Sequence, residues 1–373
     1  MISINTKDLE FIIEHTPANQ NIMLVGRHGI GKSEILTQYY TGLHNIPVVP
    51  LFLGQMADPG DIIGLPHKNE ETGRTEFMPP FWFPIDNQPI VLFLDELNRA
   101  RPEILQVVQD LVLNKTLAGR KLPEGSRIVS AINSGEEYTL TDIDPALLSR
   151  FNVYRFVPTT VEWIRWASLN GVNERVIDFI STHEDMLESK YTNMTDSTEK
   201  HADRRSWKRV SDFMNACPYD ICKNDSDVIT WRKSIAGIIG DMVGSAFCDF
   251  LKEGEAISPE LIFENFDKVI PMLNRCDTLR LMTVTMRVCI YVDRMDPVHN
   301  QAIAKDMSDG LIRYIKYLKE EAKTSSYGTV SRENAQYFVG EFESGLYPNL
   351  SAFINKTPEL DEFIMDIIEE TEC

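Results

Sequence analysis

The residues best suited to chemistry lie in a glycine-rich stretch near the start of the sequence. Residues 26–33 read Gly-Arg-His-Gly-Ile-Gly-Lys-Ser, which fits the spacing GxxxxGK[ST] between an apolar run and a helical pattern. Glycines let backbone N–H groups turn toward a polyphosphate, Lys32 can reach the terminal phosphates, and Ser33 can ligate Mg²⁺. The stretch therefore predicts a loop that binds ATP together with Mg²⁺.

The predicted nucleotide contacts come from this loop and from the first helical turn after it. They are Gly26, His28, Gly29, Ile30, Gly31, Lys32, Ser33 and Glu34. The position of His28 is unconstrained in the motif, so its side chain is given no chemical role.

A second signal is an apolar run, residues 90–94, that ends in two acids. Open α/β sheets bind ligands at the carboxyl ends of their strands. Asp95 is predicted to hold Mg²⁺, and Glu96 to polarise the water that attacks the terminal phosphate. Two acids after a strand can also be a solvated strand end, but the phosphate loop upstream favours the functional interpretation.

These residues require a parallel sheet to hold them. Five near-continuous apolar runs, the pattern of strands buried on both faces, are Ile22–Val25, Val48–Leu53, Ile90–Leu94, Ile128–Ile132 and Val153–Val157. They predict an α/β core that ends near Pro158. After Val161 helical spacing takes over, and residues 235–251 are predicted to form one helix with an apolar face.

Composition narrows the class of protein. The chain has 373 residues, 37 Lys and Arg against 56 Asp and Glu, and a net charge of -19, which disfavours nucleic acid as the main partner. No apolar run approaches the roughly 18 residues that span a bilayer, and no signal peptide is seen, so a cytoplasmic protein without a membrane anchor is expected. The six cysteines form no CxxC pair and are expected to be free thiols.

Residues 95–100, Asp-Glu-Leu-Asn-Arg-Ala, resemble the DE[IL]NRA stretch of MoxR-type AAA+ ATPases. The stretches 61–64, 71–73 and 77–80 are similar to the helix-2 insert of that family. The resemblance implies a P-loop NTPase fold with three parts. These are an AAA+ five-stranded α/β core over 1–158, a helical lid over 159–223 and an all-helical C-terminal extension over 224–373.

The same resemblance implies roles for further residues. Asn133, at the end of the run 128–132, matches the sensor-1 residue, which contacts the attacking water or the γ-phosphate. Arg150, in a segment ending Ser-Arg-Phe, matches the arginine finger, and a planar, permanently charged guanidinium suits that role. Arg155, in the next strand, is the less favoured candidate. Arg205 is chosen as the sensor-2 arginine, although Arg204 stands where the family often has proline, which leaves the choice between the two open.

The implied function is a ring, most simply a hexamer, that hydrolyses ATP at subunit interfaces and remodels or activates a partner protein. The resemblance points to a client or adaptor with a von Willebrand A domain or to a metalloenzyme. Two alternatives remain: a nucleic-acid-acting AAA+ motor, and a nucleotide-gated scaffold with little turnover. The aromatic residues of the insert, Phe77, Phe81, Trp82 and Phe83, fit either a contact surface or side chains folded back on the core.

Overall fold

The computed structural model describes the whole chain except residues 134–142, 190–199, 219–224, 253–256, 322–330 and 373. The chain divides into two compact units, Met1–Thr159 and Thr160–Cys373. The boundary falls directly after the last strand of the sheet and before the first helix of the second unit. The proposed division of the second unit into a lid and an extension stays a prediction.

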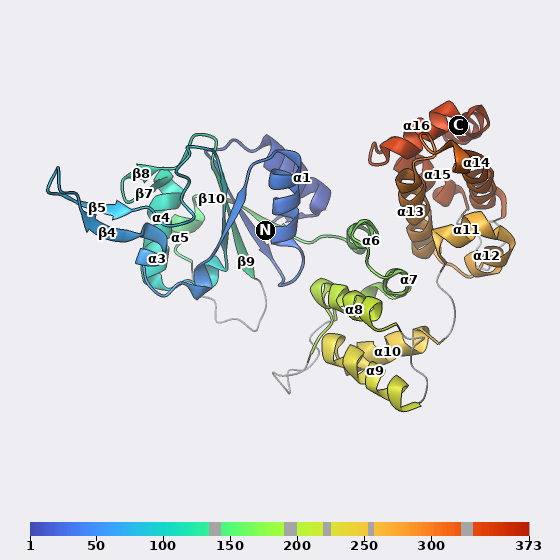
Figure 1. Cartoon of the computed structure of the whole chain (residues 1–373), viewed down its shortest axis with the longest axis horizontal. Helices are drawn as coiled ribbons and strands as arrows, with labels where there is room; N and C mark the ends of the chain where they lie inside the picture. Colours follow the sequence, from blue (N-terminus) through green and yellow to red (C-terminus); the bar gives the residue numbers. More distant parts are fainter. Residues whose placement is uncertain (134–142, 190–199, 219–224, 253–256, 322–330, 373) are drawn as a thin grey trace. The chain divides into compact units, whose positions relative to one another are not determined.

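The first unit is built on a parallel sheet with the strand order β1-β10-β2-β9-β6-β3 (Figure 1). Its strands are β1 (Ser3–Ile4), β2 (Asn21–Gly26), β3 (Val48–Phe52), β6 (Val91–Asp95), β9 (Arg127–Asn133) and β10 (Phe151–Phe156). The prediction of a parallel α/β sheet is confirmed, and all five predicted runs are strands to within two residues at each end. The prediction of five strands is wrong, because β1 adds a sixth. This two-residue edge strand, with Ser3 opposite Arg155, is too short to carry a recognisable pattern.

Successive side chains of the central strands pack on opposite faces of the sheet. On β6, Leu92 and Leu94 lie in one apolar cluster with α4, while Val91 and Phe93 lie in a second with α1. Burial on both faces explains the continuous apolar runs in the sequence. The helical segments described in this unit are α1 (Thr6–His15), α2 (Lys32–Leu36), the π-helical η1 (Thr37–Leu43), the 3-10 helices η2 (Leu53–Gln55) and η3 (Leu97–Arg99), α3 (Gly60–Ile63), α4 (Pro102–Asn114) and α5 (Pro145–Leu148).

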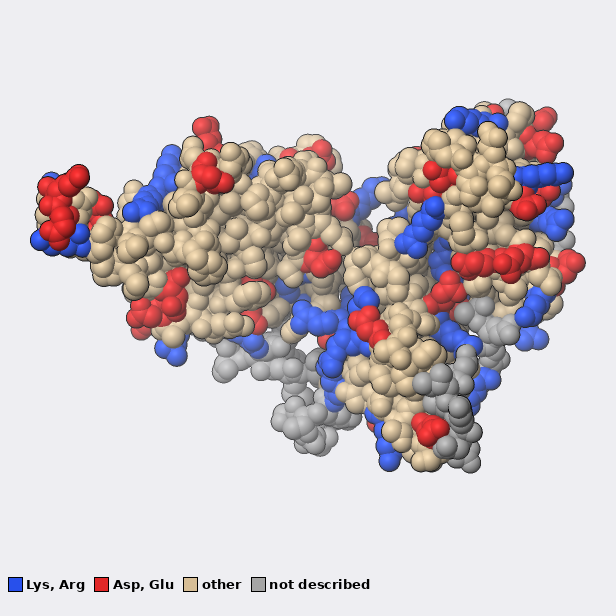
Figure 2. All heavy atoms as spheres, in the orientation of Figure 1, with Lys and Arg blue, Asp and Glu red and all other residues tan. Residues whose placement is uncertain are grey.

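An antiparallel hairpin, β4 and β5, projects from the first unit (Figure 1). In the sequence it lies between β3 and β6. The strands outside the main sheet are β4 (Leu65–Lys68), β5 (Thr75–Met78), β7 (Thr116–Leu117) and β8 (Arg120–Lys121). Acidic and basic side chains mix at the hairpin tip in Figure 2, and Lys68 Nζ lies 3.2 Å from Glu70 Oε2. The aromatic residues of the insert divide, because Trp82 is buried in the core whereas Phe81 is 97% exposed.

The second unit is helical throughout its described residues. Its α-helices are α6 (Thr160–Leu169), α7 (Glu174–Thr182), α8 (Arg204–Ala216), α9 (Asp225–Ile239), α10 (Asp241–Phe250), α11 (Pro259–Glu264), α12 (Phe266–Leu273), α13 (Thr278–Met295), α14 (Gln301–Lys316), α15 (Ser331–Glu343), α16 (Pro348–Lys356) and α17 (Pro358–Glu372). One apolar cluster runs from α6 to α17. The described cysteines are free thiols, as expected, and Cys222 and Cys373 lie outside the described residues.

The single helix predicted over residues 235–251 is wrong, because Gly240 separates α9 from α10. Its φ of 89° is disfavoured for other residues. A Cβ at this position would also lie 2.3 Å from the carbonyl oxygen of Lys200. The apolar spacing is present in both helices, but it continues across a break that a glycine makes possible.

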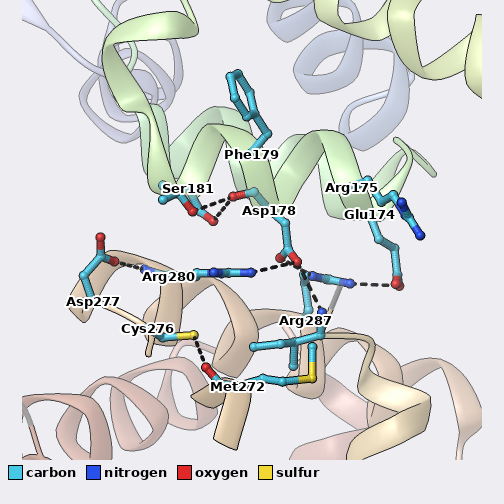
Figure 3. Close-up of polar contacts among 12 residues, drawn as sticks. Glu174, Arg175, Asp178, Phe179, Ser181, Met272, Cys276, Asp277, Arg280 and Arg287 are labelled. Atoms are coloured by element: carbon cyan, nitrogen blue, oxygen red, sulfur yellow. Dashed lines mark hydrogen bonds and ion pairs between the residues drawn. The ribbon is translucent and has the colours of Figure 1, made fainter. Parts of the chain in front are cut away.

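A buried ion-pair cluster ties α7 to α13 (Figure 3). The Asp178 side chain is fully buried, and its carboxylate accepts hydrogen bonds from Arg287 Nη1 at 3.1 Å and from Arg280 Nη2 at 3.5 Å. The backbone N–H of Ile257 donates to the same carboxylate at 3.2 Å. Arg287 Nη2 also lies 2.9 Å from Glu174 Oε1. A buried carboxylate is tolerated here because two guanidinium groups and a backbone amide face it.

Candidate nucleotide site

The glycine-rich loop connects β2 to α2 with the backbone geometry that its sequence requires. Gly29 and Gly31 have φ values of 77° and 93°, in the left-handed region that glycine adopts without strain. Gly26 is needed for a different reason, since a Cβ there would lie 2.6 Å from the Cδ1 atom of Ile30 and 2.8 Å from the carbonyl oxygen of Phe156. Three glycines thus shape a loop that ends at the N-terminus of a helix, an arrangement suited to anions.

Lys32 is the first residue of α2, and its side chain folds back into the loop. Its ammonium group donates hydrogen bonds to the carbonyl oxygens of Gly26 and Arg27 and to Asn133 Oδ1, each at 2.9 Å. These three acceptors use the three N–H donors of a lysine. Phosphate oxygens could take the place of such acceptors, so the loop holds the ammonium where a polyphosphate needs it.

The other predicted loop contacts follow the direction of the backbone. Ser33 and Glu34 are exposed in the first turn of α2, His28 is exposed in the loop, and Ile30 is buried against the sheet. Glu34 Oε1 accepts a hydrogen bond from Gln38 one turn later, at 3.1 Å. Ile30 therefore supports the loop from within, whereas the other three side chains face outward.

Asp95 ends β6 at the same edge of the sheet as the loop. Its partial burial raises the pKa of the carboxyl, while the backbone N–H of Glu96 and the charges of Lys32 and His28 act in the opposite direction. The amide of Glu96 donates to Asp95 Oδ1 at 2.9 Å. A carboxylate that is partly desolvated beside a phosphate loop is suited to a divalent cation, and Ser33 offers the hydroxyl that the motif pairs with it.

Glu96 has an unusual backbone for a residue other than glycine, with φ 56° and ψ 38°. Such conformations persist where the surrounding structure enforces them, and they concentrate at functional sites. Its carboxylate pairs with Arg99 Nη1 at 2.8 Å. Gly54 lies against the same carboxylate, since a Cβ at this position would lie 2.8 Å from Glu96 Oε2. No sequence pattern points to Gly54, because it lies 42 positions before Glu96.

Asn133 ends β9, directly beside the last residue of β2, and is only 6% exposed. Its side chain contacts Lys32, and its carbonyl oxygen accepts a hydrogen bond from Asn98 Nδ2 at 3.3 Å. Asn98 follows the paired acids by two residues and links their turn to the end of β9. The structure therefore brings together Lys32, Asp95 and Asn133, which the sequence assigned to one site.

Arg150 lies where the strands β10 and β2 begin, at the end of the sheet opposite the phosphate loop. The next residue, Phe151, pairs with Asn21 at the start of β2, whereas the phosphate loop follows Gly26 at the end of that strand. The five residue steps from Asn21 to Gly26, at about 3.3 Å each, separate the two ends of the strand by about 16 Å. An extended arginine side chain covers less than half of that distance. The exposed Arg150 side chain is thus not part of the site formed by its own subunit.

The two arginines that begin α8 differ in their surroundings. Arg204 is 9% exposed and donates from Nε to Glu188 Oε1 at 2.6 Å. Arg205 is exposed. Because Arg204 is buried in an ion pair, Arg205 stays the preferred candidate for sensor 2, and that role stays a prediction.

The parallel sheet, the glycine-rich loop and the polar residues at its strand ends define the first unit as a nucleotide-binding domain of the P-loop class. Residues 21–151 match the family described as AAA domain, dynein-related subfamily. This part of the chain is therefore an AAA+ ATPase domain, which confirms the prediction of an ATPase at the level of the domain.

The comparison with known proteins also finds BssE of Thauera aromatica, which is named as a candidate chaperone. The two sequences are 30% identical over 154 residues, 38% of this chain and 52% of that protein. The match thus spans about half the length of this relative.

Similar solved structures include NtrX from Brucella abortus with ADP, 13% identical, covering 82% of this chain and 68% of that chain at a TM-score of 0.37. The RuvB branch migration motor of Thermotoga maritima is 16% identical and covers 73% of this chain and 76% of that chain, at a TM-score of 0.35. Structural similarity at these scores carries no argument about the function of this chain.

Proposed function

We propose that this chain is an AAA+ ATPase of the MoxR type that assembles into a closed ring, most simply a hexamer, and uses ATP hydrolysis to remodel a partner protein. The AAA domain over residues 21–151 supports the ATPase part of the proposal. The DELNRA sequence at residues 95–100 and the hairpin inserted before β6 support the MoxR type.

The proposed chemistry divides among the residues at the carboxyl edge of the sheet. The loop amides and Lys32 bind the phosphates, and Asn133 orients the terminal phosphate or the attacking water. Glu96 polarises that water once its carboxylate leaves Arg99. Ser33 and Asp95 would hold Mg²⁺, which neutralises phosphate charge when bound.

One observation carries the proposal of a ring: Arg150 lies at the amino-terminal ends of the strands, whereas the phosphate loop lies at their carboxyl ends. An arginine finger at the amino-terminal ends serves only a site presented by another copy of the chain. If each subunit gives its finger to one neighbour, the contact is heterologous, and such contacts form a ring when the rotation closes. Hydrolysis then depends on assembly.

The partner and the cellular location are part of the same proposal. The similarity to BssE supports a chaperone-like role, and the resemblance to MoxR proteins supports a client or adaptor with a von Willebrand A domain in the cytoplasm. Among the described residues, no helix combines the length and the apolar character needed to cross a membrane.

The proposal is tested by measuring ATP turnover and mass together as the protein concentration is raised. Turnover per subunit should be low for monomers and should rise with the fraction of closed rings at saturating ATP and Mg²⁺. A monomeric species with full turnover would contradict the ring. Rings with ATP bound but no turnover would favour the nucleotide-gated scaffold, and turnover that requires added DNA or RNA would favour the nucleic-acid motor.

A further inference from the structure

The side chain of Asn21 connects β2, α4 and the turn before β10, at the end of the sheet opposite the phosphate loop. Asn21 is the first residue of β2 and is only 5% exposed. Its Nδ2 donates to the carbonyl oxygen of Val112 at 3.0 Å and to the carbonyl oxygen of Arg150 at 3.2 Å. Val112 lies in the last turn of α4, where carbonyl oxygens have no N–H donor within the helix. Asn21 therefore uses both of its amide protons on backbone oxygens.

The backbone of Arg150 is fixed on both sides. Its N–H donates to the carbonyl oxygen of Leu147 at 3.1 Å, and its own carbonyl accepts from Asn21. Leu147 is 2% exposed and Phe151 is 7% exposed, so apolar side chains anchor the turn before and after Arg150. The Arg150 side chain itself is exposed. The turn thus has a fixed direction in which it presents the guanidinium group.

We infer that Asn21 is a positioning residue for Arg150, acting on the active site of the neighbouring subunit. The inference rests on the proposed trans action of Arg150. Without the Asn21 amide, the buried carbonyl oxygen of Val112 and the partly buried carbonyl oxygen of Arg150 lose this donor, and the turn between α5 and β10 is free to shift. A shift of about 1 Å at a group that stabilises a transition state is enough to reduce the rate by up to about a hundredfold.

A purely structural role for Asn21 has the opposite signature. Asn21 begins the strand that ends in Gly26 and leads into the phosphate loop of the same subunit. If its loss disturbed β2, the defect would lie in the site of the subunit that carries the substitution. A positioning role instead leaves that site intact and impairs the finger offered to the neighbour. Mixed rings distinguish the two.

The test begins with Asn21→Ala in the full chain. ATP affinity should stay within about threefold of wild type, while turnover should fall between about fivefold and a hundredfold. Asn152→Ala is the matched control, because Asn152 lies at the same edge and donates from its side chain to Gln20 Oε1 at 3.0 Å. This control should retain wild-type turnover. Unchanged turnover of Asn21→Ala would overturn the inference.

The decisive step is a pair of mixing experiments, with the composition of the rings checked by mass. Asn21→Ala mixed with Glu96→Gln should exceed the activity of either parent, since the intact finger of the latter completes the intact site of the former. Asn21→Ala mixed with Arg150→Ala should show no gain, because both subunits then lack a working finger. The reverse pattern, or no gain in either mixture, would overturn the inference.

A reference mixture separates this inference from the proposal beneath it. Arg150→Ala mixed with Glu96→Gln tests the trans finger alone, so a failure there removes the proposed function. A gain there without a gain for Asn21→Ala and Glu96→Gln removes only the role of Asn21. If Asn21→Ala proves insoluble, Asn21→Ser keeps one donor and should give a smaller defect with the same mixing pattern.

Discussion

The ammonium group of Lys32 lies 2.9 Å from Asn133 Oδ1, a contact between residues 101 positions apart in the sequence. It joins the phosphate loop after β2 to the end of β9, the neighbouring strand. Because Lys32 also donates to two carbonyl oxygens of its own loop, phosphate binding has to exchange hydrogen bonds that already exist. The residue proposed to sense the γ-phosphate is thus in contact with the residue proposed to bind it.

Lys32→Ala should weaken ATP binding by on the order of a hundredfold, because charge-assisted hydrogen bonds contribute about 1.5–3 kcal/mol. A titration with a fluorescent ATP analogue measures the change. Lys121→Ala removes an exposed lysine in the same unit and should bind as wild type does. Equal affinity for the two variants would show that the loop is not the phosphate site.

Gly54→Ala should slow ATP turnover by about tenfold or more while leaving ATP affinity within about threefold. The added Cβ would lie 2.8 Å from Glu96 Oε2 and 3.1 Å from the Cβ of Arg99, so the proposed catalytic carboxylate has to move. Gly42→Ala is the matched control, since a Cβ there meets no atom within 4 Å. If Gly54→Ala turns over ATP at the wild-type rate, the position of the Glu96 carboxylate does not matter for hydrolysis.

Asp95→Asn should raise the melting temperature of the protein in the absence of nucleotide and metal, by about 1–4 °C. Burial raises the pKa of the Asp95 carboxyl, so the folded state binds the proton more tightly than the unfolded state does. Stability contributed by this group is present below the ordinary pKa and is lost as the pH rises through the raised pKa. At neutral pH the ionised carboxylate is therefore destabilising, and the neutral amide removes that cost.

The same substitution should abolish Mg²⁺-dependent turnover and the additional thermal stabilisation that Mg²⁺ gives in the presence of ATP. Scanning calorimetry with and without Mg²⁺ and ATP measures both effects. Asp309→Asn, which changes an exposed carboxylate, should alter neither. A lower melting temperature for Asp95→Asn would show that its carboxylate is a structural group.

Asp178→Asn should destabilise the second unit by about 3–5 kcal/mol, because part-buried Arg280 loses the Asp178 carboxylate and buried Arg287 is left with only the more exposed Glu174 as a counter-charge. Four of the five tryptophans lie in this unit, so urea unfolding followed by tryptophan fluorescence reports mainly on it. Glu174→Gln is the control at the rim of the same cluster, where the side chain is 42% exposed, and it should cost about 1 kcal/mol or less. Equal losses of unfolding free energy for the two variants would show that the burial of Asp178 does not determine its contribution to stability.

The parts of the fold that could be predicted are those with a local signal. The strand Ile22–Val25 and the loop that follows it have a fixed motif and a continuous apolar run, and both are present. The edge strand β1 and the break at Gly240 could not be predicted, since one is two residues long and the other depends on contact with the backbone of Lys200.

In the candidate site, too, only the residues with a local sequence signal could be predicted. Lys32, Asp95 and Asn133 each follow a strand in the sequence, and parallel strands bring their carboxyl ends to one edge. Contacts set by the packing of remote segments, such as Gly54 against Glu96 and Asn21 against Arg150, have no sequence pattern. The ion pair of Arg204 with Glu188, which favours Arg205 as the sensor-2 candidate, likewise has no sequence pattern.

The proposed trans action of Arg150 within a ring can be tested by mixing two inactive variants. Arg150→Ala should bind ATP but hydrolyse it poorly, and Glu96→Gln should bind ATP with turnover slowed about a hundredfold or more. After subunit exchange at equal amounts, about a quarter of the interfaces join an intact site to an intact finger. ATP turnover of the mixture should exceed that of either variant alone. Mixed rings, verified by mass, whose turnover never exceeds that of the parents at any ratio would contradict it.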